Sequence, residues 1–372
     1  MVIAGGRVAG AATARRLARA GLSVLVVERG RRGADTLSTL ALMRCGVFEL
    51  GRLGVLDALV ATGAPALPTV TFHYGDREPL RLPLRPRDGV DALYAPRRTV
   101  LDALLADAAG EGGAEVLHGA RVAGLERARD GRVTGAVIEH PQAGRRTVAA
   151  RWVVGADGAD SRVARAVDAP VTRAARHTST VVYGFVAGLE LDGIDWHFAP
   201  GVGAGVIPTH GGEACVFAAT REPRFASELR GDLPGGWKRL LAECSPALAA
   251  RIAAGRLAGQ LRGFPGRLGY LRRCRGPGWA LVGDAGYFKD PITAHGLSDA
   301  LRDAELLARA LIEDSDAALA AYESTRDELS APLFDLTDRI ASYDWTLDEV
   351  QRLHVDLNRE MNREVAHLVE NR

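Results

Sequence analysis

The chain opens on a glycine-rich segment of the kind that binds a phosphate group. Gly5 and Gly10 enclose residues 6–9, between an apolar stretch and a helical one. A strand, a glycine turn and a helix N-terminus together offer free backbone N–H groups and a favourable dipole to a pyrophosphate. The middle glycine of the usual G-x-G-x-x-G pattern is Arg7 here. Its side chain could turn toward the pyrophosphate or toward solvent, and we predict the first.

Carboxylates follow three predicted buried strands. Glu28 ends the second apolar strand, where a carboxylate can accept hydrogen bonds from a ribose. Asp157 and Gly158 follow another strand, and Asp284 ends a third. Ligands of α/β folds bind at the carboxyl ends of parallel strands, so we expect these side chains at one site. Taken alone, Asp157-Gly158 is also compatible with an ordinary tight turn.

A loop before a predicted helix adds a further contact. Pro291 restricts the backbone, and Gly296 allows it to pass close to a flat ligand. The helix expected over roughly 297–312 favours negative charge on that ligand at its N-terminus. His295 could move protons or only shape the loop, and the spacing leaves both roles open.

The composition excludes several classes of function. A net charge of +1 without long charged runs argues against a nucleic-acid partner. No apolar run is long enough for an integral membrane helix. The four cysteines form no C-x-x-C pair, and we expect no metal site. Free thiols are typical of a reducing compartment, so we expect a cytoplasmic protein.

These residues require a scaffold that places strand ends together. Continuous apolar strands near 1–4, 23–28, 152–157 and 279–284 are typical of a parallel sheet buried on both faces. Two other stretches alternate apolar and polar residues, as antiparallel strands do. We therefore predict an α/β fold, in which a doubly wound domain is interrupted by an inserted β domain and followed by C-terminal helices.

The three loops, taken in order, resemble the flavin-dependent monooxygenase superfamily of the p-hydroxybenzoate hydroxylase type. That superfamily shares its FAD fold with geranylgeranyl reductases and flavin-dependent halogenases. The resemblance implies a glutathione-reductase-like FAD-binding domain over 1–67, 97–177 and 266–314. It implies an antiparallel substrate sheet over 68–96 and 178–265, and a helical segment over 315–372.

The resemblance also implies which residues bind FAD. The glycine loop would hold the pyrophosphate, Glu28 the adenosine ribose, Asp284 the ribityl chain, and residues 291–297 the isoalloxazine ring. The complete set of expected cofactor-binding residues is Gly5, Gly6, Arg7, Val8, Ala9, Gly10, Glu28, Arg29, Arg44, Arg98, Val122, Asp157, Gly158, Gly283, Asp284, Pro291, Ala294, His295, Gly296 and Leu297. Catalytic residues stay unassigned.

The activity implied is a monooxygenase that takes electrons from NADPH or NADH and oxygen from O2. Its substrate would be a small hydrophobic molecule, aromatic or polyketide-like, because aromatic residues are frequent in the β-rich text. Two alternatives stay open: a reductase or oxidase of the geranylgeranyl-reductase branch that acts on a C=C bond, and a flavin-binding protein without turnover. The chain lacks the W-x-W-x-I-P motif of halogenases. The oligomeric state is left open.

Overall fold

A computed structural model describes residues 1–371. Its first layer is a six-stranded sheet in the order β17-β18-β9-β1-β2-β5, parallel except for the β17–β18 pair. Buried apolar residues fill its central strands, as the sequence predicts. The bounds are β1 Val2–Ala4, β2 Leu25–Glu28, β5 Glu115–His118, β9 Val153–Gly155, β17 Arg275–Gly276 and β18 Trp279–Leu281.

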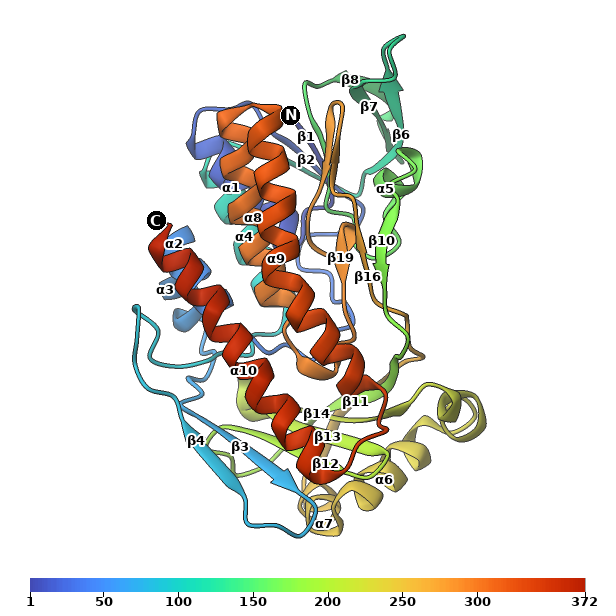
Figure 1. The fold of residues 1–372 in the computed structure, drawn as a ribbon. Coiled ribbons are helices and arrows are strands. Elements are labelled where there is room, and N and C mark those ends of the chain that lie inside the picture. The colour runs from blue at the N-terminus through green and yellow to red at the C-terminus, as the bar shows by residue number, and fades with distance from the viewer. Residues whose placement is uncertain (372) are drawn as a thin grey trace.

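Helices cover this sheet. α1, α4 and α8 pack side by side, and α2 lies against α8 (Figure 1). α1 is lined by small residues on its buried side, which permits its close approach to the strands. The bounds are α1 Val8–Arg19, α2 Arg44–Leu53, α3 Leu56–Ala61, α4 Arg98–Glu111, α5 Arg162–Ala166 and α8 Gly296–Glu313.

A seven-stranded sheet forms the second layer, in the order β15-β11-β14-β13-β12-β3-β4. Strands from 69–83 and from 179–264 therefore share one sheet. The β3–β12 pair is parallel, and the other pairs are antiparallel as expected. The bounds are β3 Thr69–Tyr74, β4 Leu80–Pro83, β11 Ser179–Ala187, β12 Ile194–Ala199, β13 Val202–Pro208, β14 Glu213–Arg221 and β15 Arg256–Phe264.

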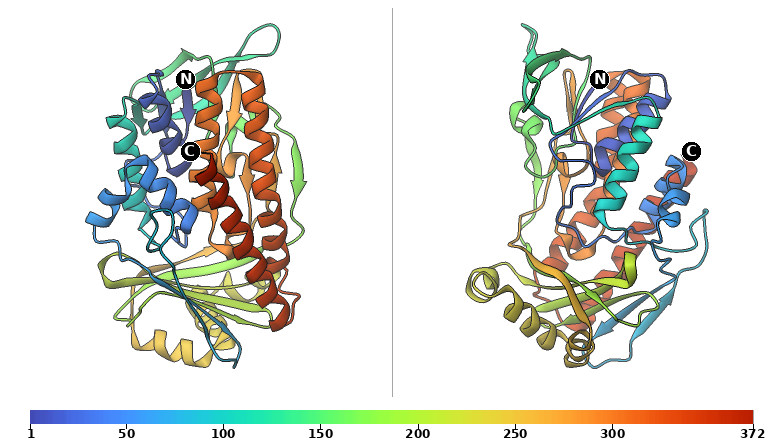
Figure 2. Two further views of the ribbon diagram at one scale, coloured as in Figure 1. Left: turned by 60° about the vertical axis from the view of Figure 1, so that its left-hand side comes forward. Right: turned by 180° about the vertical axis from the view of Figure 1, so that it is seen from behind.

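The outer face of this sheet carries two helices, visible at the foot of the molecule in Figure 2. They are α6 (Leu233–Cys244) and α7 (Pro246–Ala254). Ser245 separates them because its extended backbone ends α6 and its hydroxyl accepts the Leu248 N–H as the N-cap of α7. Pro246 then suits the first position of the new helix.

Two small sheets complete the fold, with the orders β6-β7-β8 and β10-β16-β19. The second lies between the two large sheets, whereas the first lies beside the six-stranded sheet, at the end of the molecule away from the seven-stranded sheet (Figure 1). Their strands are β6 Arg121–Arg127, β7 Val133–His140, β8 Gly144–Ala149, β10 Val171–Ala174, β16 Tyr270–Arg272 and β19 Tyr287–Phe288. Residues 1–371 also contain four short helical turns. Three are 3₁₀ turns and η2 is a π turn: η1 His210–Gly212, η2 Phe225–Leu229, η3 Gly283–Ala285 and η4 Pro291–Thr293.

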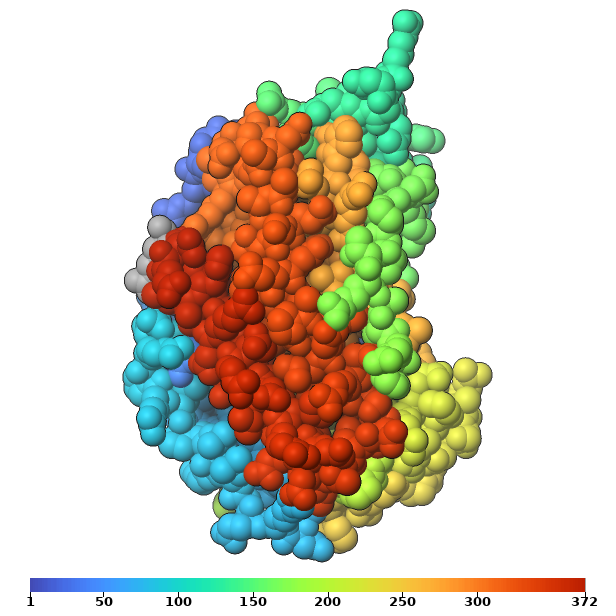
Figure 3. Space-filling view, in the orientation of Figure 1, coloured from blue at the N-terminus to red at the C-terminus, as the bar shows by residue number. Residues whose placement is uncertain are grey.

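The chain ends in two long helices, α9 (Asp316–Ala341) and α10 (Leu347–Glu370). A capping box between Thr346 and Glu349 begins α10. Both helices run along one face of the molecule from the six-stranded sheet to the seven-stranded sheet (Figures 1 and 3). The last residue of the predicted helical segment, 372, lies outside the described residues. In residues 1–371, every helix is too short or too polar to cross a membrane.

Candidate functional site

A cavity of about 710 Å³ opens at the carboxyl ends of the parallel strands. The loops after β1, β2, β9 and β18 line it, together with residues 36–41 and the N-terminus of α8. It brings together these expected site residues: Gly5, Arg7, Val8, Ala9, Glu28, Arg29, Arg98, Val122, Asp157, Gly158, Asp284, Pro291, Ala294, Gly296 and Leu297.

The glycine loop is shaped for close packing at both ends. Gly5 has a φ of +101°, and a Cβ atom there would lie 2.3 Å from the Ala156 carbonyl oxygen. A Cβ atom on Gly10 would lie 1.9 Å from the Gly5 carbonyl oxygen. Both positions therefore require glycine, and α1 can begin directly beside β1 with its N-terminus at the cavity.

Glu28 is positioned by the backbone of two loops. Its Oε2 accepts the Gly6 N–H at 2.8 Å, and its Oε1 accepts the Gly30 N–H at 2.7 Å. The side chain is almost fully buried, yet it contributes to the cavity wall. The carboxylate is thus held at the edge of the cavity, where its remaining lone pairs can accept hydrogen bonds from a ligand.

Arg7 belongs to a charged group at the cavity wall. Its Nη1 lies 3.7 Å from Asp102 Oδ2, and the Arg98 guanidinium binds the same carboxylate at 2.9 and 3.0 Å. Burial raises the pKa of Asp102, while the two arginines oppose that rise. Nη1 of Arg7 is buried and makes no hydrogen bond. Two guanidinium groups thus flank one carboxylate at this part of the wall, and a guanidinium suits a phosphate.

The Asp157 carboxylate is largely occupied by its own loop. Its Oδ1 accepts the Ser161 hydroxyl at 2.6 Å, and its Oδ2 accepts the Arg162 N–H at 2.7 Å. These bonds fix the turn that leads into α5, and Gly158 adopts a φ of +79° there. Asp157 and Gly158 therefore form an ordinary tight turn, and both residues also line the cavity.

Asp284 points into the cavity from the η3 turn after β18. Water reaches it through the cavity, but the surrounding protein still desolvates the carboxylate and raises its pKa to about 6. Gly283 lies beneath it and packs against Ala9 of α1, since an added Cβ would approach the Ala9 Cβ to 2.8 Å.

The loop from 290 to 297 is tied to the seven-stranded sheet. Asp290 caps η4 by accepting the Ile292 N–H at 3.0 Å. The same carboxylate accepts the N–H and the hydroxyl of Ser179 in β11, each at 2.6 Å. Ala294 then takes a left-handed conformation with a φ of +49°, which turns the chain into α8.

Five expected site residues do not line the cavity. Gly6, Gly10 and Gly283 lie in the loops behind its surface. The Arg44 guanidinium instead binds the carbonyl oxygens of Arg85, Arg87 and Val90. His295 is buried, and its Nε2 lies 2.8 Å from Glu364 Oε2 of α10.

Sequence reasoning missed Lys289. Its side chain is buried, lines the cavity and is paired with Asp299 of α8, which also lines it. The available signal was its residue type, because the chain has only two lysines among 47 basic residues. The aromatic residues of the β-rich segments, from which we expect a hydrophobic substrate, do not line the cavity. Tyr183, Phe185, Trp196, Phe198 and Phe217 belong to the core between the two layers.

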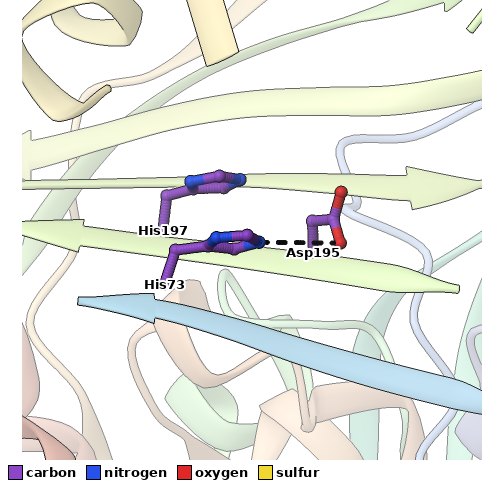
Figure 4. A group of neighbouring side chains, drawn as sticks. All are labelled: His73, Asp195 and His197. Atoms are coloured by element: carbon purple, nitrogen blue, oxygen red, sulfur yellow. Dashed lines mark ion pairs between the residues drawn. The ribbon is translucent and has the colours of Figure 1, made fainter. Parts of the chain in front are cut away.

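A second polar group lies on the outer face of the seven-stranded sheet. The rings of His73 and His197 stack at 4.0 Å, and His73 Nε2 lies 3.9 Å from Asp195 Oδ1 (Figure 4). The other carboxylate oxygen of Asp195 accepts a hydrogen bond from Arg251 at 2.6 Å. Parallel rings do not converge on one point, and Arg251 already balances the carboxylate. We therefore interpret this group as a structural contact between β3, β12 and α7.

A family model described as "FAD binding domain" matches residues 1–337. The chain belongs to this FAD-binding family. The predicted resemblance to the p-hydroxybenzoate hydroxylase-type flavoproteins and the predicted fold class are confirmed. The FAD-binding protein described here is thus a FAD-dependent oxidoreductase.

Several known proteins are similar to this FAD-binding protein. Digeranylgeranylglycerophospholipid reductase 1 of Methanopyrus kandleri is 30% identical over 369 residues, which cover 92% of this chain and 89% of that one. The flavin-dependent brominase Bmp2 has a TM-score of 0.80 at 19% identity, covering 100% of this chain and 99% of that one. PqsL of Pseudomonas aeruginosa, titled a probable FAD-dependent monooxygenase, has a TM-score of 0.77 at 22% identity, covering 96% and 98%. At these identities the two solved structures establish a shared fold.

Proposed function

We propose that the protein is a FAD-dependent monooxygenase that uses NADPH or NADH and O2 on a small hydrophobic substrate, aromatic or polyketide-like. The observation that carries this proposal is that one cavity gathers the strand-end loops, the Arg7–Arg98 group and the N-terminus of α8. Bound FAD would supply electron transfer from the nicotinamide and reaction with O2. The free thiols of all four cysteines fit a cytoplasmic location.

The shape and charge of the cavity fit FAD. The Gly5–Gly10 cradle and Arg7 would hold the pyrophosphate, because free N–H groups and a cation meet there. Glu28 would accept hydrogen bonds from the adenosine ribose, and Arg29 and Val122 would lie beside the adenine. The remaining expected residues that line the cavity, such as Arg98, Asp157 and Asp284, would contact the part of FAD between the pyrophosphate and the flavin ring.

At the α8 end, the protein would orient the flavin ring and stabilise negative charge on it. Pro291, Ala294, Gly296 and Leu297 form the wall there. The backbone N–H groups at the start of α8 lack helical partners, so they can donate hydrogen bonds to an anionic edge of the ring. Asp284 would accept a hydrogen bond from the ribityl chain.

A reductase that acts on a C=C bond is the second candidate. The specific observation in its favour is the 30% identity to the digeranylgeranylglycerophospholipid reductase of M. kandleri across nearly the full length of both chains. Such a reaction would use the same cavity and would not need O2.

Oxygen dependence separates the two candidates. The FAD-loaded protein would be screened with aromatic, polyketide-like and polyprenyl compounds, and NADPH or NADH oxidation would be followed in air and under nitrogen. Under nitrogen a monooxygenase consumes only enough nicotinamide to reduce its own FAD, whereas in air it turns over and transfers one atom of ¹⁸O₂ to the product. Turnover under nitrogen, with a saturated product, would reject the monooxygenase and support the reductase. A flavin that no nicotinamide reduces would leave a flavin-binding protein without turnover.

A further inference from the structure

Lys289 occupies an unusual position for a lysine. It lies between β19 and η4, only 3% of its side chain is exposed, and it forms part of the cavity wall. Its Nζ contacts Asp299 Oδ2 and lies 5.0 Å from the centre of the Tyr287 ring. The ammonium group is therefore held at one end of the cavity, beside Pro291 and the start of α8.

A network of charged groups stands behind this lysine. Asp299 Oδ1 lies 3.3 Å from Arg302 Nη1 and 3.9 Å from His295 Nε2. Glu364 reaches the network from α10, at 2.8 Å from His295 Nε2 and 2.7 Å from Arg302 Nη1. Arg302 also donates hydrogen bonds to Asp303 and, at 2.8 Å, to Ser330 of α9.

The formal charges of this network favour a proton on Lys289 but do not fix it there. Three carboxylates (Asp299, Asp303 and Glu364) face two cations (Lys289 and Arg302), and burial lowers the pKa of His295, which disfavours a third cation. Burial and the Arg302 charge act against the ammonium. Together with the opposing carboxylates, including Asp284, they leave the pKa of Lys289 at about 7.

Residue type matters at this position. An arginine would keep its charge at every pH at which the protein folds, whereas a buried lysine can release its proton near neutrality. All but two of the 47 basic residues of the chain are arginines. A lysine on the cavity wall therefore places a group there that can exchange a proton, which arginine cannot do.

Both candidate reactions consume a proton. Insertion of one oxygen atom consumes NADPH, O2 and one proton, and releases water. Reduction of a C=C bond consumes NADPH and one proton. Either way, one proton must enter the cavity in each turnover.

We propose that Lys289 is the acid–base residue of the cavity, and that Asp299, His295 and Glu364 are positioning residues for its ammonium group. In the proton-transfer step one Nζ–H bond breaks, its electron pair stays on the nitrogen, and the proton joins an atom of the bound molecule. A proton from water then restores the ammonium. The inference rests on the proposed function in that a flavin and its substrate occupy this cavity.

The test begins with the titration of Lys289 itself. Protein labelled with [6-¹³C]lysine gives only two side-chain signals, and Lys238→Arg assigns them. We expect the Lys289 signal to titrate near neutral pH without FAD, and at higher pH when anionic FAD is bound. Titration that begins only above pH 9.5, or a midpoint that FAD does not move, would overturn the proposal.

Variants then separate proton exchange from charge. Lys289→Arg should keep FAD affinity but remove the decrease in affinity that the wild type shows as pH rises through the Lys289 titration. Lys289→Met should weaken FAD binding about tenfold at pH 6. Lys238→Met, at an exposed position, is the matched control. If Lys289→Met does not fold, the wild-type titration and Lys289→Arg still decide.

Turnover provides the final comparison. We expect Lys289→Arg to bind FAD and lower kcat at least tenfold, whereas a wild-type kcat and pH profile in that variant would contradict the acid–base role. Glu364→Gln should shift the titration of Lys289 if Glu364 acts through the network. Failure of the wild type to oxidise NADPH with any substrate would count against the proposed function, whereas an ordinary Lys289 titration would count against this inference alone.

Discussion

At the scale of single residues, the replacement of the middle glycine by Arg7 keeps the loop suited to an anion. Asp102 is shared by Arg7 and Arg98, so the Arg7 guanidinium is held beside the cavity and is not free in solvent. A guanidinium fixed in this way has already lost much of its conformational freedom before a ligand binds. The arginine can thus contribute charge where glycine would have contributed only space.

We therefore expect Arg7→Ala to weaken FAD binding by about tenfold or more, in line with the loss of one charge-assisted hydrogen bond. Flavin fluorescence quenching would measure the dissociation constant at two salt concentrations. Arg19→Ala, at the exposed far end of α1, should leave the constant unchanged. An unaltered constant in Arg7→Ala would show that this arginine only replaces glycine.

The sequence could predict Gly5, Glu28 and Asp284 because their roles depend on local chain geometry. A glycine turn, the end of a strand and the start of a helix are each determined by a few neighbouring residues. Lys289 could not be predicted in the same way, since its burial depends on Asp299 of α8 and on Glu364 of α10. The backbone partners of Arg44 also could not be predicted, because they come from an irregular loop at 85–90 that has no sequence pattern.

At the scale of secondary-structure elements, the buried parallel strands were the easiest to predict, because each lies in an apolar segment of the sequence. Val153–Gly155 and Trp279–Leu281 are uninterrupted apolar runs. In contrast, β16 is held by its pairing with β10 and β19, which no local sequence pattern indicates. The sequence also could not predict that β3 and β12 pair in parallel, because their relative direction depends on the path of the chain between residues 74 and 194.

His197, in the β3–β12 pair, should make the free energy of unfolding depend on pH. Burial lowers the pKa of His197 to about 3, from an ordinary value of 6.5. Between these values the unfolded chain binds a proton that the folded chain does not, so the free energy of unfolding falls as pH decreases below 6.5. The slope for one such group is at most about 1.4 kcal/mol per pH unit.

Urea unfolding at pH 7.5, 6.5 and 5.5 would measure this effect. His197→Phe keeps a flat ring against His73 but cannot titrate, so its stability should fall less steeply below pH 6.5 than that of the wild type. Some slope should persist, because burial also lowers the pKa of His354 to about 3. Equal slopes in the two proteins would contradict the assignment to His197.

At the scale of the whole molecule, α9 and α10 join the two layers. Both pack along α8 or its neighbours, and their far ends reach the core beside the seven-stranded sheet. Their decisive contact, between Glu364 and the His295–Arg302 pair, spans more than 60 residues, which no periodic pattern reveals.

Glu364 should therefore be needed for the stability of the whole fold. Glu364→Gln removes a buried charge from two buried partners, and such losses cost about 3–5 kcal/mol. We expect a lower free energy of unfolding in urea and a lower melting temperature. Glu370→Gln, at the exposed end of the same helix, should change neither by more than about 0.5 kcal/mol. Comparable effects in the two variants would rule out this role.

The hydrogen bonds that the Asp290 carboxylate accepts should control amide exchange in both the sheet and the loop. It accepts the amide hydrogens of Ser179 in the seven-stranded sheet and of Ile292 beside the cavity. Neither amide can exchange with deuterated solvent unless its bond to this one side chain opens. We therefore expect both amides to exchange at similar rates and Asp290→Ala to accelerate both. Rapid exchange at Ile292 beside slow exchange at Ser179 would show that the loop opens while the sheet stays closed.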